Sequence, residues 1–175
     1  SVFDYDIAID PLTFTGRAVE KSDENGTHDG RIITCPIPKT DVKDGYCYQR
    51  FIDSSFSGDT SEDLRIACVF GKVGAVFHKH KAFDKIFSTS YLNTTVHLAQ
   101  DRFSENELTL IETFCQAMGL DFGSIDVMRD KVDGKIYIVD VNKTCMPVLS
   151  LPTKEQLRSL KMIAKVFEKG LLETV

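Results

Sequence analysis

The dipeptide Asp133-Gly134 separates two apolar segments, residues 122–129 and 135–142, and it constrains the fold of this chain more than any other feature. Asp-Gly between alternating apolar residues is a strong sign of a β-hairpin, because a type I′ turn needs positive φ at both central residues. The two segments are therefore predicted to be neighbouring antiparallel strands.

Polar side chains interrupt both predicted strands. Side chains alternate along a strand, so Asp126 points away from the apolar residues on either side of it. In the second strand the same alternation places Asp140 and Asn142 on one face, together with Ile136 and Ile138. Two paired strands can thus direct two carboxylates and one amide oxygen at a common point.

Oxygen ligands of this kind suit a hard cation such as Mg²⁺, which takes its remaining ligands from water and phosphates. An Asp-x-Asn sequence more often simply ends a strand. Here apolar strands carry the carboxylates inward, where an unpaired charge costs several kcal/mol, so a metal ion or a lysine is expected beside them.

The rest of the chain predicts a mixed fold. Strands are expected at 16–21, 31–35, 46–52, 64–70 and 74–78, with loops at 22–30 and 53–62. Residues 81–102 show no clear period and are interpreted as a long substrate-facing stretch. Strands and helices do not alternate strictly, so the predicted class is α+β with antiparallel sheets.

Two helices carry recognisable start signals. Ser104 with Glu107 is typical of a capping box, and Gly119 ends that helix. Thr153 with Gln156 predicts a second capping box. The second helix is expected to bury one apolar face, formed by Leu157, Leu160, Ile163, Ala164, Phe167 and Leu171.

Composition narrows the classes of partner. The 175 residues suffice for one ordinary core, and a net charge of −5 without a long Lys/Arg run argues against nucleic acid. The basic stretch at 78–81 is too short to change this. No apolar run could cross a membrane, so a cytoplasmic protein is expected. The five cysteines stand far apart and indicate neither a disulfide framework nor a zinc site.

Two further segments carry candidate ligand-binding groups. Lys21 ends a strand and precedes a loop containing His28 and Gly30, so its ammonium and the loop N–H groups could meet a phosphate. Most such lysines are simply solvated, and a loop histidine is more often a bystander. The strand at 46–52 could line a purine, or be ordinary core. Arg65 could bind a phosphate or pair with an adjacent acid.

These motifs, in this order, resemble the ATP-grasp superfamily. Val19-Glu20-Lys21 and the loop ending at Asp29-Gly30 are similar to its strand lysine and phosphate loop. Tyr48-Gln49-Arg50-Phe51-Ile52 is similar to its adenine-holding hinge, and Asp63-Leu64-Arg65 to the segment that opens its second lobe. The segment 119–126, the Asp133-Gly134 turn and the segment 137–142 resemble its metal-binding hairpin. The similarity covers about residues 15 to 147.

The resemblance implies a role for each matched position. For the nucleotide it implies contacts from Lys21, His28, Gly30, Gln49, Phe51, Ile52 and Asp63, the last facing the ribose. For Mg²⁺ or Mn²⁺ it implies Asp126, Asp140 and Asn142 as ligands, and for the transferred phosphoryl group it implies Arg65 and Lys81. It also implies a smaller lobe at 1–52, a larger lobe at 53–175, and a preceding substrate domain outside this chain.

The implied activity is that of an ATP-dependent carboxylate–amine or carboxylate–thiol ligase, which forms an acyl phosphate before the nucleophile attacks. A kinase on the same fold and a regulatory nucleotide-binding module are the alternatives. The expected partners are ATP and a small-molecule or peptide acceptor. A homodimer is an option, and binding to nucleic acid or to a membrane is not expected.

Overall fold

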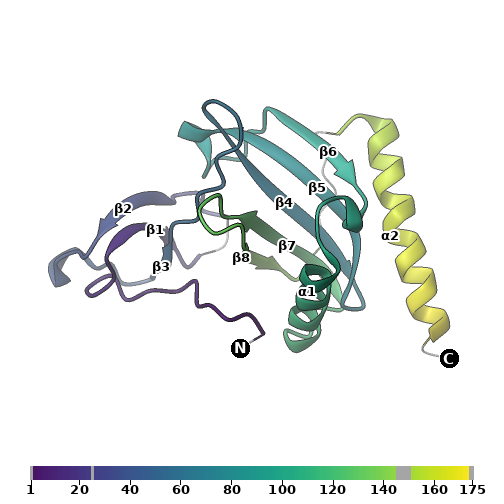
Figure 1. Cartoon of the computed structure of the whole chain (residues 1–175), viewed down its shortest axis with the longest axis horizontal. Helices are drawn as coiled ribbons and strands as arrows, with labels where there is room; N and C mark the ends of the chain where they lie inside the picture. The colour runs from purple at the N-terminus through teal and green to yellow at the C-terminus, as the bar shows by residue number, and fades with distance from the viewer. Residues whose placement is uncertain (1, 25, 145–150, 174–175) are drawn as a thin grey trace.

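The protein is built on two antiparallel sheets (Figure 1). The computed structural model describes residues 2–24, 26–144 and 151–173, apart from the side chain of residue 173. The smaller sheet has the order β2-β1-β3 and contains β1 (Gly16–Ser22), β2 (Arg31–Cys35) and β3 (Tyr46–Arg50). The larger has the order β6-β5-β4-β7-β8 and contains β4 (Thr60–Val69), β5 (Lys72–Ala82), β6 (Asn93–His97), β7 (Phe122–Arg129) and β8 (Ile136–Asn142).

Helices flank the larger sheet. They are α1 (Glu105–Ala117) and α2 (Thr153–Glu173), with short 3-10 turns at Lys39–Asp41, Phe83–Lys85 and Ala99–Asp101. The predicted α+β class with antiparallel sheets is confirmed. None of the helices in the described ranges combines the length and the apolar composition that a membrane crossing requires.

The predicted hairpin is present as β7 and β8, and Gly134 adopts a φ of 71° in its turn. The register changes between Asp126 and Val127, because Asp126 pairs with Asp140 while Val127 pairs with Ile138. Val139 is the extra residue of a β-bulge, which reverses the alternation of β8. The prediction that Asp140 shares a face with Ile136 and Ile138 is therefore wrong, since both isoleucines are buried in the core.

The central strands are longer than predicted. β4 begins at Thr60, within the predicted 53–62 loop, and β5 continues to Ala82. The stretch 81–102 also contains β6, which pairs with β5. The polar residues at the start of β4 resemble a loop in sequence, but their partners lie across the sheet on β5.

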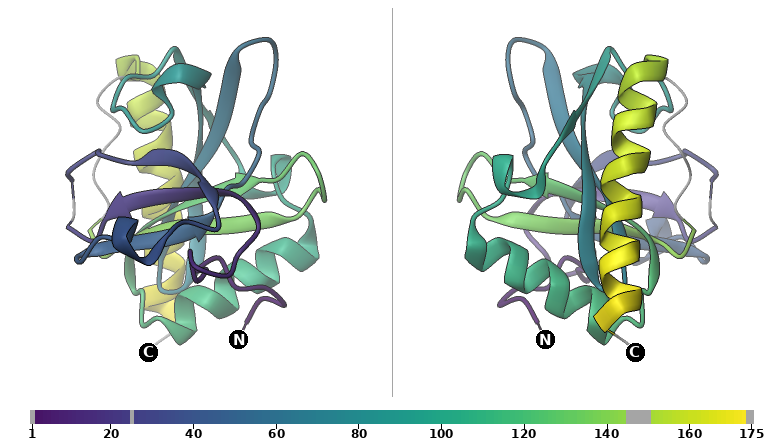
Figure 2. Two further views of the ribbon diagram at one scale, coloured as in Figure 1. Left: turned by 90° about the vertical axis from the view of Figure 1, so that its left-hand side faces the viewer. Right: turned by 90° about the vertical axis from the view of Figure 1, so that its right-hand side faces the viewer.

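The core occupies both faces of the larger sheet, and alternate residues of β4 point to opposite sides. Ile66 packs with Ile111 and Cys115 of α1, whereas Ala67 packs with Met162 and Ile163 of α2. The N-terminus of α1 is the predicted capping box, in which Ser104 accepts from the Glu107 N–H and Glu107 accepts from the Ser104 N–H. Figure 2 shows α2 on the side of the molecule away from the smaller sheet.

The predictions for the last helix need correction. The N–H of Gln156 donates to the Pro152 carbonyl, so Thr153 is already inside the helix. The Gln156 amide donates to the Leu151 carbonyl instead of completing a capping box. Much of the predicted buried face is exposed, including Leu157, Leu160, Ala164, Phe167 and Leu171. Met162 and Ile163 pack on the sheet, Arg158 donates to the Val96 carbonyl of β6, and Phe167 stacks on Phe70.

Candidate functional site

A cavity of about 250 Å³ lies between the two sheets, beside a wider hollow of about 910 Å³. Residues of β1 and β3 line one side, and residues of β4, β5, β7 and β8 line the other. The cavity is lined by ten of the predicted site residues, Lys21, His28, Gln49, Phe51, Ile52, Asp63, Arg65, Lys81, Asp126 and Asp140. The remaining two, Gly30 and Asn142, line the wider hollow. The fold thus gathers every residue that the sequence singled out.

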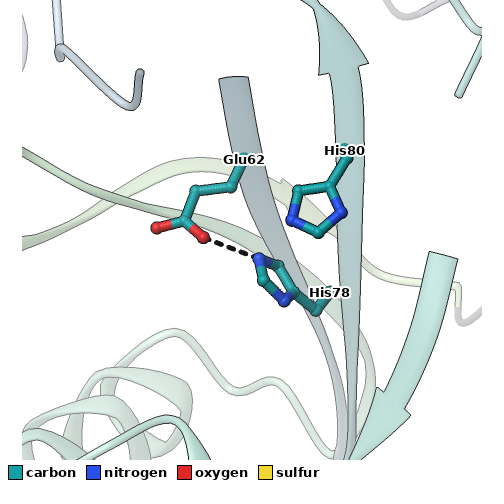
Figure 3. Close-up of side chains that lie close together, drawn as sticks. All are labelled: Glu62, His78 and His80. Carbon is teal, nitrogen blue, oxygen red and sulfur yellow. Dashed lines mark hydrogen bonds and ion pairs between the residues drawn. The ribbon is translucent and has the colours of Figure 1, made fainter. Parts of the chain in front are cut away.

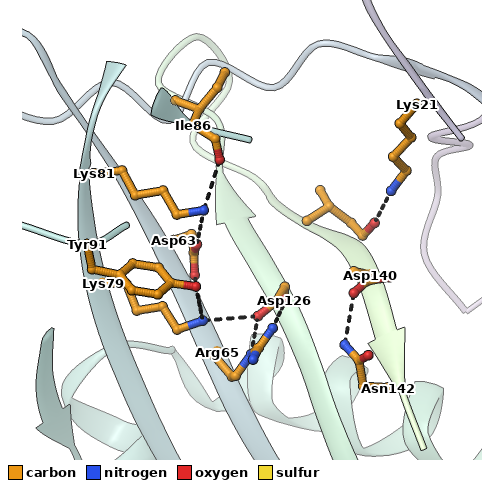
Figure 4. Close-up of polar contacts among 11 residues, drawn as sticks. Lys21, Asp63, Arg65, Lys79, Lys81, Ile86, Tyr91, Asp126, Asp140 and Asn142 are labelled. Carbon is orange, nitrogen blue, oxygen red and sulfur yellow. Dashed lines mark hydrogen bonds and ion pairs between the residues drawn. The ribbon is translucent and has the colours of Figure 1, made fainter. Parts of the chain in front are cut away.

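A buried lysine that the sequence reading missed stands among the charged groups of the cavity wall (Figure 4). Lys79 of β5 is 1% exposed, and its ammonium lies 3.7 Å from the Asp63 carboxylate and 3.7 Å from the Asp126 carboxylate. It also donates to the Tyr91 hydroxyl at 3.4 Å. A buried ammonium needs such anionic partners, because an unpaired charge in the interior is costly.

Arg65 and Asp126 form a bidentate ion pair across β4 and β7. The guanidinium donates to both carboxylate oxygens, at 2.8 Å and 2.6 Å. This hydrogen bonding raises the pKa of Arg65 above its ordinary value. Burial opposes ionisation of Asp126, but the Arg65 hydrogen bond and the charge of Lys79 outweigh it and lower the pKa of the carboxyl group. Both groups are therefore charged at neutral pH.

Lys81 extends the charged wall toward the rim of the cavity. Its ammonium lies 3.8 Å from Asp63 and donates to the carbonyl of Ile86 at 2.9 Å. Burial lowers the pKa of Lys81, and burial also raises the pKa of Asp63. Asp63, for which the resemblance implies a ribose contact, lies between these two lysines.

Asp140 and Asn142 lie at the edge of the same cavity system. Asp140 pairs directly opposite Asp126, and Asn142 opposite Ser124. The Asn142 amide donates to Asp140 at 2.8 Å, which leaves its carbonyl oxygen and the second Asp140 oxygen available. Among the described residues, Asp140 forms no ion pair, and its carboxylate lines the wider hollow. This donor set fits Mg²⁺.

The smaller sheet contributes Lys21, whose ammonium reaches across the cavity to the Val139 carbonyl of β8 at 3.3 Å (Figure 4). This contact holds the lysine beside Val139, the residue before Asp140. In the loop that follows, the side chain of Asp29 accepts from the Ser22 N–H and the Tyr46 hydroxyl, which fixes the loop to β3.

Aromatic side chains close the two ends of the cavity. A side chain at Gly30 would collide with the ring of Phe87, which therefore lies directly on the loop. At the other end, Arg17 stacks on Phe51 with 4.2 Å between guanidinium and ring centre, and Phe83 meets Phe51 edge-on. The segment predicted to hold adenine has left the strand by Phe51, whose N–H donates to the Arg17 carbonyl.

Lys79, Tyr91 and Phe87 are the site residues that sequence reasoning missed. Lys79 could have been predicted from the sequence, because side-chain alternation along the strand at 78–81 places it on the same face as Lys81. No local pattern marks Tyr91 or Phe87, because both reach the cavity from irregular segments.

No protein-family model matches this sequence, and no curated protein does. Solved structures do share the fold. The ATP-grasp ligase PsnB complexed with minimal precursor, Mg and ADP gives a TM-score of 0.52 at 13% identity, covering 86% of this chain and 46% of that one. PsnB with precursor peptide PsnA2 and AMPPNP gives the same TM-score, identity and coverage.

A third PsnB complex, with a phosphomimetic variant of the minimal precursor, Mg and ADP, gives a TM-score of 0.51 at 14% identity, over 86% of this chain and 47% of that one. This chain therefore has the ATP-grasp fold, and it spans about half the length of the PsnB chains. The fold anticipated from the hairpin and the strand lysine is confirmed.

Proposed function

We propose that the cavity between the two sheets binds Mg-ATP and that the chain is the nucleotide-binding part of an ATP-dependent carboxylate–amine or carboxylate–thiol ligase. The observation that carries the proposal is the arrangement of charges. Two cations on the larger sheet, Arg65 and Lys81, and a third on the smaller sheet, Lys21, line one cavity whose edge presents Asp140 and Asn142, and a fourth, Lys79, is buried behind the cavity wall.

The cations would bind and orient the triphosphate. Phosphoryl transfer depends mostly on positioning and on neutralising negative charge that spreads over the phosphoryl oxygens. Lys21 approaches from the loop side, while Lys81 and Arg65 lie on the opposite wall. Lys79 is held by two carboxylates, so we assign it the role of keeping Asp63 and Asp126 in place behind the outer cations.

Asp140, Asn142 and Asp126 would hold Mg²⁺ or Mn²⁺. Asp126 is already bound by Arg65, so Asp140 and the Asn142 carbonyl oxygen are the readily available ligands. When bound, the metal supplies positive charge that neutralises the phosphate oxygens.

The proposed reaction has two steps. A carboxylate of the acceptor attacks the γ-phosphorus of ATP, which gives an acyl phosphate and ADP. An amine or thiol then attacks the acyl carbon, and inorganic phosphate leaves. The PsnB complexes with minimal precursor, Mg and ADP and with precursor peptide PsnA2 and AMPPNP support a nucleotide and a peptide acceptor here.

The test is an assay of the full chain with Mg-ATP, an equimolar mixture of the twenty free amino acids, and hydroxylamine as the trapping nucleophile. A ligase of this kind is expected to release ADP and form a hydroxamate, since hydroxylamine attacks an acyl phosphate. Asp140→Asn should abolish both products, whereas Asp121→Asn, an exposed carboxylate at the start of the same hairpin, should retain them.

Other results separate the alternatives. Release of ADP without hydroxamate would favour a kinase. Nucleotide binding without ADP release would favour a regulatory module or a ligase whose acceptor is a peptide. Undiminished product formation by Asp140→Asn would contradict the proposed metal ligand.

A further inference from the structure

A cluster of metal-ligating side chains lies on the other face of the larger sheet (Figure 3). Glu62 of β4 and His78 and His80 of β5 bring their ligand atoms within 4.8 Å of one another. Glu62 pairs opposite His80, whereas Asp63 pairs opposite Lys79. Because side chains alternate along a strand, this cluster faces away from the cavity that contains the lysines.

The cluster is compact and partly enclosed. His78 Nε2 lies 2.6 Å from a Glu62 carboxylate oxygen, and the two imidazole ring centres are 4.3 Å apart. Phe56 covers the group, with its ring centre 4.9 Å from that of His80. His78 is 2% exposed, while the Glu62 side chain is 22% exposed, so solvent reaches the cluster from the carboxylate side.

Two imidazole nitrogens of the cluster lack a partner. In the part of the chain that the structure describes, His78 Nδ1 and His80 Nε2 are buried and make no hydrogen bond. Buried polar atoms are nearly always bonded, because an unsatisfied one costs about 1–3 kcal/mol. A ligand for imidazole nitrogen would remove part of this cost.

The protonation states favour a cation. Burial lowers the pKa of His80, with further lowering from the nearby His78 and Arg102, so its ring is neutral at pH 7 and keeps a lone pair. The His78 hydrogen bond lowers the pKa of Glu62, which is ionised. Arg102, the other charged group facing the cluster, donates to His97 at 3.1 Å. Metal ions require neutral imidazole and ionised carboxylate.

We propose that Glu62, His78 and His80 form a binding site for a divalent transition metal of the Zn²⁺ class, with water as the fourth ligand. Two nitrogens and one carboxylate suit Zn²⁺, whereas Mg²⁺ prefers oxygen ligands alone. Tetrahedral Zn²⁺ places its ligand atoms about 3.3 Å apart. The present ligand atoms lie within 4.8 Å of one another, so metal binding would draw them together by at most about 1.5 Å. The site is independent of nucleotide binding in the cavity.

The metal would join β4 to β5 directly behind the lysines, because Lys79 lies between His78 and His80 in the chain. It would also fix the end of β4 that follows the loop containing Phe56. The predicted consequence is structural, namely a more stable sheet at this point.

The test uses the full chain, freed of metal by a chelator and then titrated with Zn²⁺ in a calorimeter and with Co²⁺ in an absorption spectrometer. We expect one saturable site per chain without nucleotide. Glu62→Gln and His80→Asn should each weaken Zn²⁺ binding at least tenfold and reduce the visible Co²⁺ bands. Both side chains are partly exposed, so these variants are expected to fold, and circular dichroism checks this.

Matched controls are His28→Asn, in an exposed loop, and Glu112→Gln, on the exposed side of α1. Both should bind Zn²⁺ like the wild type, as should Asp140→Asn. Zn²⁺ should raise the melting temperature of the wild type but not that of His80→Asn. Equal binding by every variant, loss of binding in Asp140→Asn alone, or no saturable binding would each overturn the proposal.

Discussion

Lys79 and His80 are consecutive residues of β5, yet their side chains lie on opposite faces of the larger sheet and belong to different charged clusters. Lys79 faces Asp63 and Asp126 beside the cavity, and His80 faces Glu62 and His78 behind it. A four-residue basic stretch that in sequence resembles a small solvated patch therefore supplies both clusters. The alternation of a strand separates their chemistry.

Lys79→Met is expected to weaken Mg-ATP binding at least tenfold and to destabilise the fold, because it leaves Asp63 and Asp126 facing each other. Breaking a buried ion pair costs about 3–5 kcal/mol, and the remaining Lys81 and Arg65 reduce that loss. Urea unfolding and nucleotide titration measure both effects. Lys72→Met, which removes an exposed ion pair with Glu112, should cost less than about 1 kcal/mol. A Lys79→Met protein as stable as the control would contradict the network described here.

Gly123→Ala is expected to disturb the proposed metal ligands Asp140 and Asn142 through the backbone. A side chain at Gly123 would collide with the carbonyl oxygen of Asn142, so β8 must shift. We expect a loss of about 1–3 kcal/mol in unfolding free energy and weaker Mg²⁺ dependence of nucleotide binding. Gly134→Ala is the control: its φ of 71° imposes strain, but nothing lies within 4 Å. If both variants show the same Mg²⁺ dependence, the contact with Asn142 has no role.

Glu20→Gln is expected to destabilise the smaller sheet at neutral pH but less in acid. Glu20 is buried and accepts from Arg31 at 2.6 Å and Lys43 at 2.7 Å, and the Arg31 bond is the main reason that its pKa is lowered. Because the pKa of Glu20 is lower in the folded state than the unfolded value of 4.5, its ionised carboxylate stabilises the fold at pH values above 4.5. This stabilisation is lost as the pH falls below 4.5 and the carboxylate becomes protonated. The difference in melting temperature between wild type and variant should therefore narrow from pH 7 to pH 3. A constant difference would contradict the ion-pair account.

Local signals predicted the parts of the fold that depend on a few consecutive residues. The Ser104–Glu107 capping box is present, because it is complete within four residues. The predicted hairpin is also present, but only Gly134 of the Asp-Gly pair has a positive φ, and the loop that joins the strands spans residues 130–135. Hairpin pairing brings β7 and β8 side by side as predicted, but Asp140 lies opposite Asp126 only because Val139 is bulged.

Features that depend on distant contacts were not predictable. The bulge at Val139 has no sequence signature, and it decides which side chains of β8 are buried. Lys79 is buried because Asp63 and Asp126 surround it, and neither is near it in sequence. The apolar period of α2 predicted a buried face, but Leu157, Leu160, Phe167 and Leu171 are exposed.

The central claim is that the cavity between the two sheets holds ATP together with a divalent metal. Titration calorimetry of the full chain with ATP, with and without Mg²⁺, tests it most directly. We expect one nucleotide per chain, tighter binding with Mg²⁺, and at least tenfold weaker binding in Lys21→Met and Asp140→Asn. An absence of saturable binding, or equal affinity and equal Mg²⁺ dependence in wild type and both variants, would contradict the account.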